Sequence, residues 1–172
     1  MKKTLNSILL VVLISVFAFT GTIMTAKAPP PKAEFFITLS WISGSVEEKV
    51  ENEQIRIYKL NQSWVITEAN ILLDNGIEGG HIDFSWLVVH VKQTDVAHGS
   101  GQFEITLIDG TVLVTGAATM KATDFTKGEE RYMETKLTGH GLVNIWARYE
   151  GTGLGTVITV EGYYWQNSGQ SI

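Results

Sequence analysis

The sequence contains no cysteine. This absence excludes disulfide bonds, thiolate metal sites and a cysteine nucleophile. The chain beyond residue 28 has 144 residues, which corresponds to one domain of ordinary size. A domain of that length can bury a substantial core without covalent cross-links, and it must do so here.

Basic residues are scarce beyond the N-terminal segment. Residues 29–172 carry ten Lys and Arg against 18 Asp and Glu, which gives a net charge of −8. A field of this sign repels both a phosphate backbone and an anionic membrane surface. We therefore expect no nucleic-acid partner, and contact with a membrane only through the N-terminal segment.

Catalytic sequence motifs are missing as well. The chain has no G-x-S-x-G nucleophile elbow, no S-x-x-K motif and no HExxH zinc motif. The acidic residues are scattered, so no carboxylate pair can be derived from their spacing. We expect no cofactor, and an enzyme is the less favoured class of protein.

The first 28 residues have the pattern of an export signal. Lys2 and Lys3 precede an apolar run at 8–19, and Ala26-Lys27-Ala28 matches a signal-peptidase site. An uncleaved anchor is the alternative, because residues 5–24 are long enough to span a bilayer. Both alternatives place the rest of the chain outside the cytoplasm, either secreted or anchored to the outer face of the cytoplasmic membrane.

The remaining chain divides into three parts by composition. Residues 29–33 form a proline-rich spacer, which favours the stiff polyproline II conformation. Residues 34–166 form the predicted β domain, and residues 167–172 form a short C-terminal tail.

The β domain consists of short runs rich in Val, Ile, Thr and aromatic residues, separated by turn residues. These runs lie at 34–42, 55–60, 64–73, 82–91, 103–108, 111–123, 130–138, 143–150 and 156–165. We predict an all-β fold, a single antiparallel β-barrel of about 8–10 strands, with a β-sandwich as the alternative. Glycines inside long strands, such as Gly116 and Gly162, suit the bends of a barrel.

Two segments leave local alternatives open. Residues 46–53 follow Ser45, and Glu48 lies at the spacing of a capping box, which favours a short helix. A charged strand fits the same residues nearly as well. Asn61-Gln62-Ser63 separates two β-rich runs and predicts a hairpin loop.

Asp109-Gly110 predicts a second hairpin. A two-residue type I′ turn would pair Ile105 with Val114 and Phe103 with Gly116. Leu113 would then point outward. Directly paired residues share a face, and the inward face would consist of Phe103, Ile105, Leu107, Val112 and Val114. The turn and the hydrophobic pattern therefore indicate the same register.

The strand after this turn has small residues on its expected inner face, namely Gly116, Ala118 and Ala122. Because protein interiors are closely packed, large side chains opposite them must take up this volume, or a ligand cavity remains. We expect Trp86, His90 and Met120 to line such a cavity and to bind its ligand.

The histidines are the residues most suited to metal binding or proton transfer. His81 and Asp83 share a strand face, whereas strand parity places His90 on the opposite face. A histidine among apolar neighbours, as at His90, is typical of a hydrogen-bonded core residue, although imidazole can also act in acid–base catalysis. No dense ligand spacing occurs, and we expect no metal site.

The last two strands carry a second candidate binding surface. If their outer faces adjoin, Trp146, Arg148, Glu161 and Tyr163 form a mixed aromatic and polar patch. We expect Trp146, Arg148 and Tyr163 to contact a ligand there. A solvated sheet face with a cross-strand Arg–Glu pair explains the same pattern.

Together these patterns favour an extracytoplasmic β-barrel that binds a small apolar or amphipathic ligand without catalysis. A membrane-tethered surface interaction or structural module is the alternative, and it would expose an apolar patch or an unpaired sheet edge. A third hypothesis is an enzyme that uses His90, or His81 with Asp83.

Overall fold

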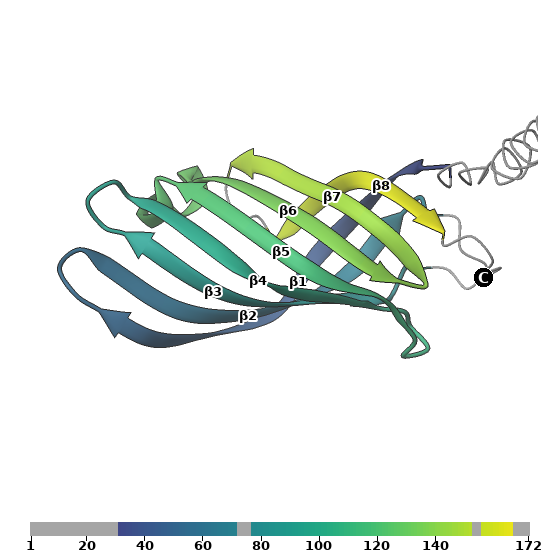
Figure 1. Ribbon diagram of the computed structural model, residues 1–172, viewed down its shortest axis with the longest axis horizontal. Helices are drawn as coiled ribbons and strands as arrows, with labels where there is room; N and C mark the ends of the chain where they lie inside the picture. The colour runs from purple at the N-terminus through teal and green to yellow at the C-terminus, as the bar shows by residue number, and fades with distance from the viewer. Residues whose placement is uncertain (1–30, 72–76, 153–155, 167–172) are drawn as a thin grey trace, which may run out of the picture.

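The computed structural model describes residues 31–71, 77–152 and 156–166. They form a closed barrel of eight antiparallel strands, in which each strand pairs with the next and the last pairs with the first (Figure 1). The strands are β1 (Ala33–Glu51), β2 (Ile55–Ala69), β3 (His81–Val91), β4 (Val96–Thr106), β5 (Val112–Thr123), β6 (Tyr132–Gly141), β7 (Val143–Thr152) and β8 (Val157–Gln166). A short 3-10 helix, η1 (Phe125–Glu130), connects β5 to β6.

The prediction of an antiparallel β-barrel is confirmed, and the sandwich alternative is wrong, because the β1–β8 pairing closes the sheet. The expected signal or anchor segment lies outside the described residues. Within the described ranges, no helix is long and apolar enough to cross a membrane.

The barrel interior is apolar because side chains alternate between its two faces. In β3, for example, Phe84 and Trp86 are buried, whereas the alternate residues Asp83 and Ser85 are exposed. The other strands contribute their alternate residues in the same way, so that one hydrophobic core runs through the barrel.

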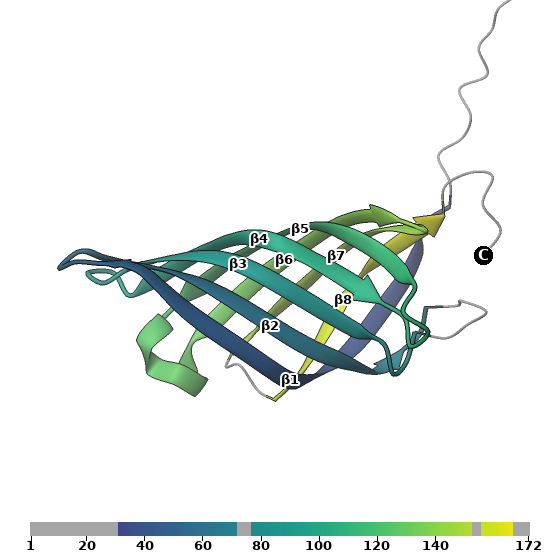
Figure 2. The ribbon, with the colours of Figure 1, turned by 90° about the horizontal axis from the view of Figure 1, so that it is seen from below.

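One end of the barrel is densely packed. Only about 10 Å³ of space remains among its side chains. They come from seven strands and are Phe35, Ile37, Leu39, Ile66, Ile82, Ile105, Leu137, Ile145, Ala147 and Val160. The β1–β2 turn and η1 both lie toward the other end of the molecule, away from the start of β1 (Figures 1 and 2).

The expected helix at 46–53 is wrong, and the charged-strand alternative holds. Val46 to Glu51 complete β1 and pair with β2 from Leu60 back to Arg56. A helix with only Val46 and Val50 on its apolar face would bury too little to offset its nucleation. The strand is held along its length by β2, and Arg56 bonds to the Glu48 carboxylate at 2.7 Å.

The expected hairpin loop at Asn61-Gln62-Ser63 is also wrong, because these residues lie within the continuous strand β2. They pair with β1 on one side and with β3 on the other. Gln62 accepts a hydrogen bond from the Trp86 indole nitrogen at 3.1 Å. Pairing on both sides and a satisfied side chain outweigh the turn preference of the local sequence.

The Asp109-Gly110 hairpin has the predicted register from Ile105 and Val114 onward, but the pairing next to the turn and the turn itself differ from the prediction. Ile105 pairs with Val114 and Phe103 with Gly116, as expected. A type I′ turn needs positive φ at both central residues, whereas of these two only Gly110 has one (86°).

Gly110 donates to the Leu107 carbonyl at 3.0 Å, and Leu107 donates to that of Thr111 at 2.8 Å. The loop between Leu107 and Thr111 is therefore longer than the two-residue turn that the sequence predicts. Thr106 pairs with Val112, and the register shifts between Thr106 and Ile105. This shift turns Val112 outward (43% exposed) and Leu113 into the core (1% exposed), which corrects both assignments.

Candidate functional site: an apolar cavity at one end of the barrel

The barrel encloses a cavity of about 180 Å³ at the end opposite the packed core. Side chains from β1, β2, β3, β5, β6, β7 and β8 line it, together with Phe125 of η1 and Arg131 just after η1. Most of these side chains are aromatic or aliphatic. The cavity is therefore suited to an apolar group rather than to an ion.

Strand β2 runs along the depth of the cavity. Its alternate residues Tyr58, Leu60, Gln62 and Trp64 all line the space. Tyr58 lies near the end of the barrel beside Phe125, with ring centroids 6.2 Å apart. Trp64 is only 2% exposed, and the next inward residue of β2 belongs to the packed end. Trp64 therefore forms the floor of the cavity.

The mouth of the cavity lies beside the distal half of β1. Val46 lines the cavity and is 64% exposed, so the space reaches the surface at this residue. Arg131 is the one charged residue that the described lining contains. Its guanidinium lies over the Phe125 ring at 5.5 Å, and its Nε donates to the Gly128 carbonyl at 3.0 Å.

The polar groups of the lining are mostly uncharged hydroxyls, indoles and an amide. Burial raises the pKa of Tyr58 to about 12 and also raises the pKa of Tyr149, so both phenols are protonated at neutral pH. Gln62 directs its oxygen to Trp86. Among the described residues no carboxylate lines the cavity. The site thus offers both donors and acceptors to a ligand, because the hydroxyls of Tyr58, Tyr149 and Thr135 can do either.

Comparisons with known proteins add no identity. No protein-family model, curated protein or solved structure matches this chain. The geometry of the cavity is therefore the basis for assigning a site.

The interior residues expected from the sequence separate into two groups. Trp86 and Met120 both line the cavity. His90 is buried next to it, but its ring packs against Phe125 at 5.0 Å and its Nε2 bonds to Asp95 at 2.9 Å. His90 thus packs against Phe125, a cavity-lining residue, and does not line the cavity itself.

Trp146, Arg148 and Tyr163 lie on the outer face of the barrel, in a shallow groove that also contains Glu161. The Trp146 and Tyr163 rings are 6.2 Å apart. Arg148 is paired with Glu161 in the strand register, but its charged group contacts Glu150 at 4.0 Å. The wall of the barrel separates this group from Trp86 and Met120.

Sequence reasoning did not single out Tyr58, Trp64, Phe125 or Thr135 as cavity residues. The signal for two of them was present in the alternation of Tyr58, Leu60, Gln62 and Trp64. Reading Asn61-Gln62-Ser63 as a loop interrupted that alternation. Phe125 had no such signal, because its position depends on how η1 folds back.

Asp95 holds η1 against the barrel through a set of contacts that we term the Asp95 latch. Its carboxylate accepts hydrogen bonds from the Thr126 amide (3.1 Å), the Thr126 hydroxyl (2.7 Å) and His90 Nε2 (2.9 Å). Its carbonyl accepts from the Phe125 amide at 3.0 Å. Asp95 adopts a left-handed conformation (φ 52°) to make these contacts, a conformation that Asp and Asn tolerate.

The latch is expected to depend on the charge of Asp95. Its hydrogen bonds, above all the one from the Thr126 hydroxyl, lower the pKa of the Asp95 carboxyl from its ordinary value of 3.8. The latch is therefore complete above that value and is lost as the pH falls through the lowered pKa. A carbon-13 titration of the Asp95 carboxyl should give a midpoint below 3.8.

Replacing Asp95 with Asn keeps the backbone conformation and removes the charge. We expect the Thr126 amide to exchange with solvent about fivefold faster at neutral pH, because a neutral acceptor bonds less strongly. The chemical shift of the Thr126 amide should also no longer change as the pH falls through the acid range, because the variant has no carboxyl at position 95 to titrate. An Asp95 midpoint at or above 3.8, or unchanged exchange at Thr126, would contradict the latch.

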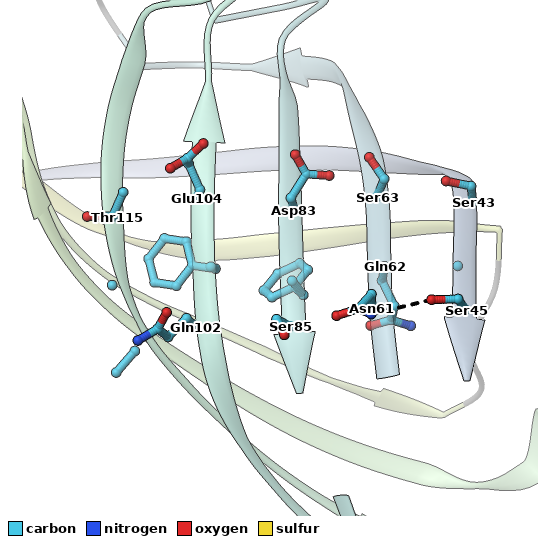
Figure 3. Close-up of a pocket in the computed structure, with 15 residues that line it drawn as sticks. Ser43, Ser45, Asn61, Gln62, Ser63, Asp83, Ser85, Gln102, Glu104 and Thr115 are labelled. Carbon is cyan, nitrogen blue, oxygen red and sulfur yellow. Dashed lines mark hydrogen bonds between the residues drawn. The ribbon is translucent and has the colours of Figure 1, made fainter. Parts of the chain in front are cut away.

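A larger groove of about 800 Å³ lies on the outer face of β1 to β5. Figure 3 shows short polar side chains from these neighbouring strands facing it, with the carboxylates of Asp83 and Glu104 side by side. Asp83 and Glu104 are directly paired across β3 and β4. The groove is open to solvent, so the hydrogen bonds it offers compete with water.

The histidines that the structure describes lie on different faces of the barrel. His81 and Asp83 are exposed on the outer face, whereas His90 is buried, as strand parity predicted. In the part of the chain that the structure describes, no three His, Asp or Glu side chains come close enough to share a metal ion.

Proposed function

We propose that this barrel binds a small apolar or amphipathic molecule in its interior cavity, without transforming it chemically. The observation that carries the proposal is the cavity of about 180 Å³ lined by aromatic and aliphatic side chains. An apolar protein cavity of about 150 Å³ holds benzene. The cavity therefore suits a ligand somewhat larger than a single aromatic ring.

The contrast between the two ends of the barrel supports this proposal. The packed end leaves about 10 Å³ of space, so the strands can fill their interior completely where Ile, Leu and Phe meet. At the other end, aromatic residues with a few donors surround a volume that is much larger. Pockets for small molecules commonly combine apolar walls with a few polar groups.

The proposal includes a location outside the cytoplasm. It rests on Lys2 and Lys3, the apolar run after them and the Ala26-Lys27-Ala28 pattern. A ligand taken from that compartment would reach the cavity through the mouth beside Val46.

The two alternative functions have less support. Ser43 to Glu51 of β1 pair with β2 alone among the described residues, which leaves a sheet edge. That edge carries Glu47, Glu48 and Lys49, and charged side chains on an edge oppose strand addition. An enzyme based on His90 is disfavoured, because Nε2 of His90 is hydrogen-bonded to Asp95 and its ring packs against Phe125.

A cavity-filling substitution tests the proposal. Thr135 lies on the inner face of β6 and lines the cavity, so Thr135→Phe should fill much of the space. We expect the affinity for the hydrocarbon probe α-methylstyrene to fall at least about thirtyfold. The measurement is a titration followed by nitrogen-15 NMR of the full-length protein.

Thr138→Phe is the matched control, because Thr138 lies on the same strand with its side chain exposed on the outer face. It should leave the affinity within about twofold of the parent value. Equal losses in both variants, or no binding of the probe by the parent protein, would contradict an interior site.

A further inference from the structure

Arg131 lines the cavity and has no acidic partner within the described part of the chain. The protein has three arginines. Arg56 contacts the Glu48 carboxylate at 2.7 Å, and Arg148 contacts Glu150 at 4.0 Å. Arg131 makes no ion pair with a described residue, although acidic residues outnumber basic ones in this domain. Its charge is therefore available to a ligand in the cavity that it lines.

Most of the hydrogen-bonding capacity of Arg131 is also unused. A guanidinium presents five N–H donors. Nε of Arg131 donates to the Gly128 carbonyl at 3.0 Å, and the guanidinium lies over the Phe125 ring at 5.5 Å. These contacts hold the group in place and leave its two terminal nitrogens without a hydrogen-bond partner among the described residues. The side chain is partly exposed, so an anion that pairs with it keeps part of its hydration.

Tyr58 provides a second donor at this end of the cavity. It lines the same space as Arg131, and its ring lies beside Phe125 with centroids 6.2 Å apart. Burial raises the pKa of Tyr58 to about 12, and the positive charge of Arg131 acts in the opposite direction. The phenol is therefore protonated at neutral pH and lies within electrostatic reach of the guanidinium. A cation and a phenolic donor at one place favour an anionic acceptor.

The rest of the lining limits the charge and the shape of that anion. From Tyr58 to Trp64 the described side chains are neutral, and most of them are aromatic or aliphatic. One guanidinium balances one negative charge, whereas a phosphate monoester would retain an uncompensated charge beside apolar walls. A planar carboxylate also matches the two parallel N–H groups of a guanidinium. The depth of the cavity suits hydrocarbon.

We propose that the ligand is a small monocarboxylate whose carboxylate pairs with the guanidinium of Arg131 and whose hydrocarbon part fills the cavity toward Trp64. This proposal rests on the proposed function, because it assigns a ligand class to the same cavity. The charged head lies where Arg131 is partly exposed, and the tail lies where the walls are apolar.

Two probes of the same shape isolate the charge of the head group. 3-Phenylpropanoate and 3-phenylpropanamide share their hydrocarbon part and differ in a carboxylate or a neutral amide. The domain is acidic as a whole, so its general field does not favour the carboxylate. We expect the parent protein to bind the carboxylate at least about tenfold more tightly than the amide. The measurement is a titration followed by nitrogen-15 NMR of the full-length protein.

Arg131→Gln removes the charge, so the ratio of carboxylate to amide affinity should fall about tenfold. Any change in the shape of the cavity affects both probes and cancels in the ratio. Arg56→Gln is the matched control, because it changes the net charge equally. Arg56 lies 5.9 Å from the centre of the Tyr58 ring but does not line the cavity. The affinity ratio of this control should stay within about twofold of the parent value.

A second measurement does not require a variant to fold. In the parent protein, the Nε–H resonance of Arg131 should shift more with 3-phenylpropanoate than with 3-phenylpropanamide. The same resonance of Arg56, which is already bonded to Glu48, is the internal control and should respond alike to the two probes.

The outcomes distinguish this inference from the proposed function. Equal affinity of the parent protein for the two probes, or equal loss of the ratio in Arg131→Gln and Arg56→Gln, would overturn the carboxylate assignment. The cavity would remain a binding site if the parent protein still binds α-methylstyrene and Thr135→Phe weakens that binding. Failure of all three probes to bind the parent protein would overturn both proposals.

Discussion

Gly101→Ala is expected to lower the free energy of unfolding by about 3 kcal/mol. Gly101 lies in β4, where a Cβ atom would overlap the backbone carbonyl oxygen of Ser85 in β3. Backbone atoms of a neighbouring strand cannot move aside as a side chain does, so the two strands would have to separate. Chemical denaturation followed by tryptophan fluorescence measures the change.

Gly99→Ala is the matched control, because Gly99 is two residues away and on the same face of the same strand. A Cβ there would meet the terminal methyl of Met120 at 2.9 Å, at the end of a flexible side chain. We expect a loss of less than about 1 kcal/mol. Equal losses at both positions would show that the close approach of β3 and β4 does not require glycine at Gly101.

Ile105→Ala is expected to cost about 4 kcal/mol of unfolding free energy. Ile105 is 1% exposed and lies in the packed end of the barrel. Its neighbours are themselves closely packed and cannot move far into the space that the shorter side chain leaves. The substitution therefore loses buried apolar surface and also leaves a cavity. Denaturation of the variant measures the loss.

Ile108→Ala removes the same atoms from a residue three positions later, in the turn after β4. Ile108 is 71% exposed, so we expect a change within about 0.5 kcal/mol. Neither substitution touches the ligand cavity, and both variants should bind α-methylstyrene like the parent where they are folded. A larger loss at Ile108 than at Ile105 would contradict the assignment of inner and outer faces.

Local patterns in the sequence predicted much of this barrel. The alternation of β3 indicated its inner face, and the register of Phe103 with Gly116 followed from Asp109-Gly110 and the hydrophobic residues around it. These inferences succeeded because side-chain direction in a strand has a period of two residues and depends on near neighbours. Trp86 and Met120 were assigned to the interior on the same basis.

Local patterns failed where distant strands decide the structure. Asn61-Gln62-Ser63 has the composition of a loop, and it is a strand because β1 and β3 pair with it on both sides. The inward turn of Leu113 depends on one residue added to the hairpin loop. One additional loop residue reverses the faces of the residues between the turn and the point where the predicted register resumes, at Ile105 and Val114.

The sequence alone determined that the chain forms antiparallel strands with an apolar inner face, because that property repeats within each strand. Only the tertiary structure decided that one end of the barrel is packed and the other hollow, that Asp95 holds η1, and that the indole nitrogen of Trp64 is buried without a hydrogen-bond partner. These features depend on which side chains from distant strands meet across the barrel. That meeting is set by closure and stagger of the whole sheet, which no single segment encodes.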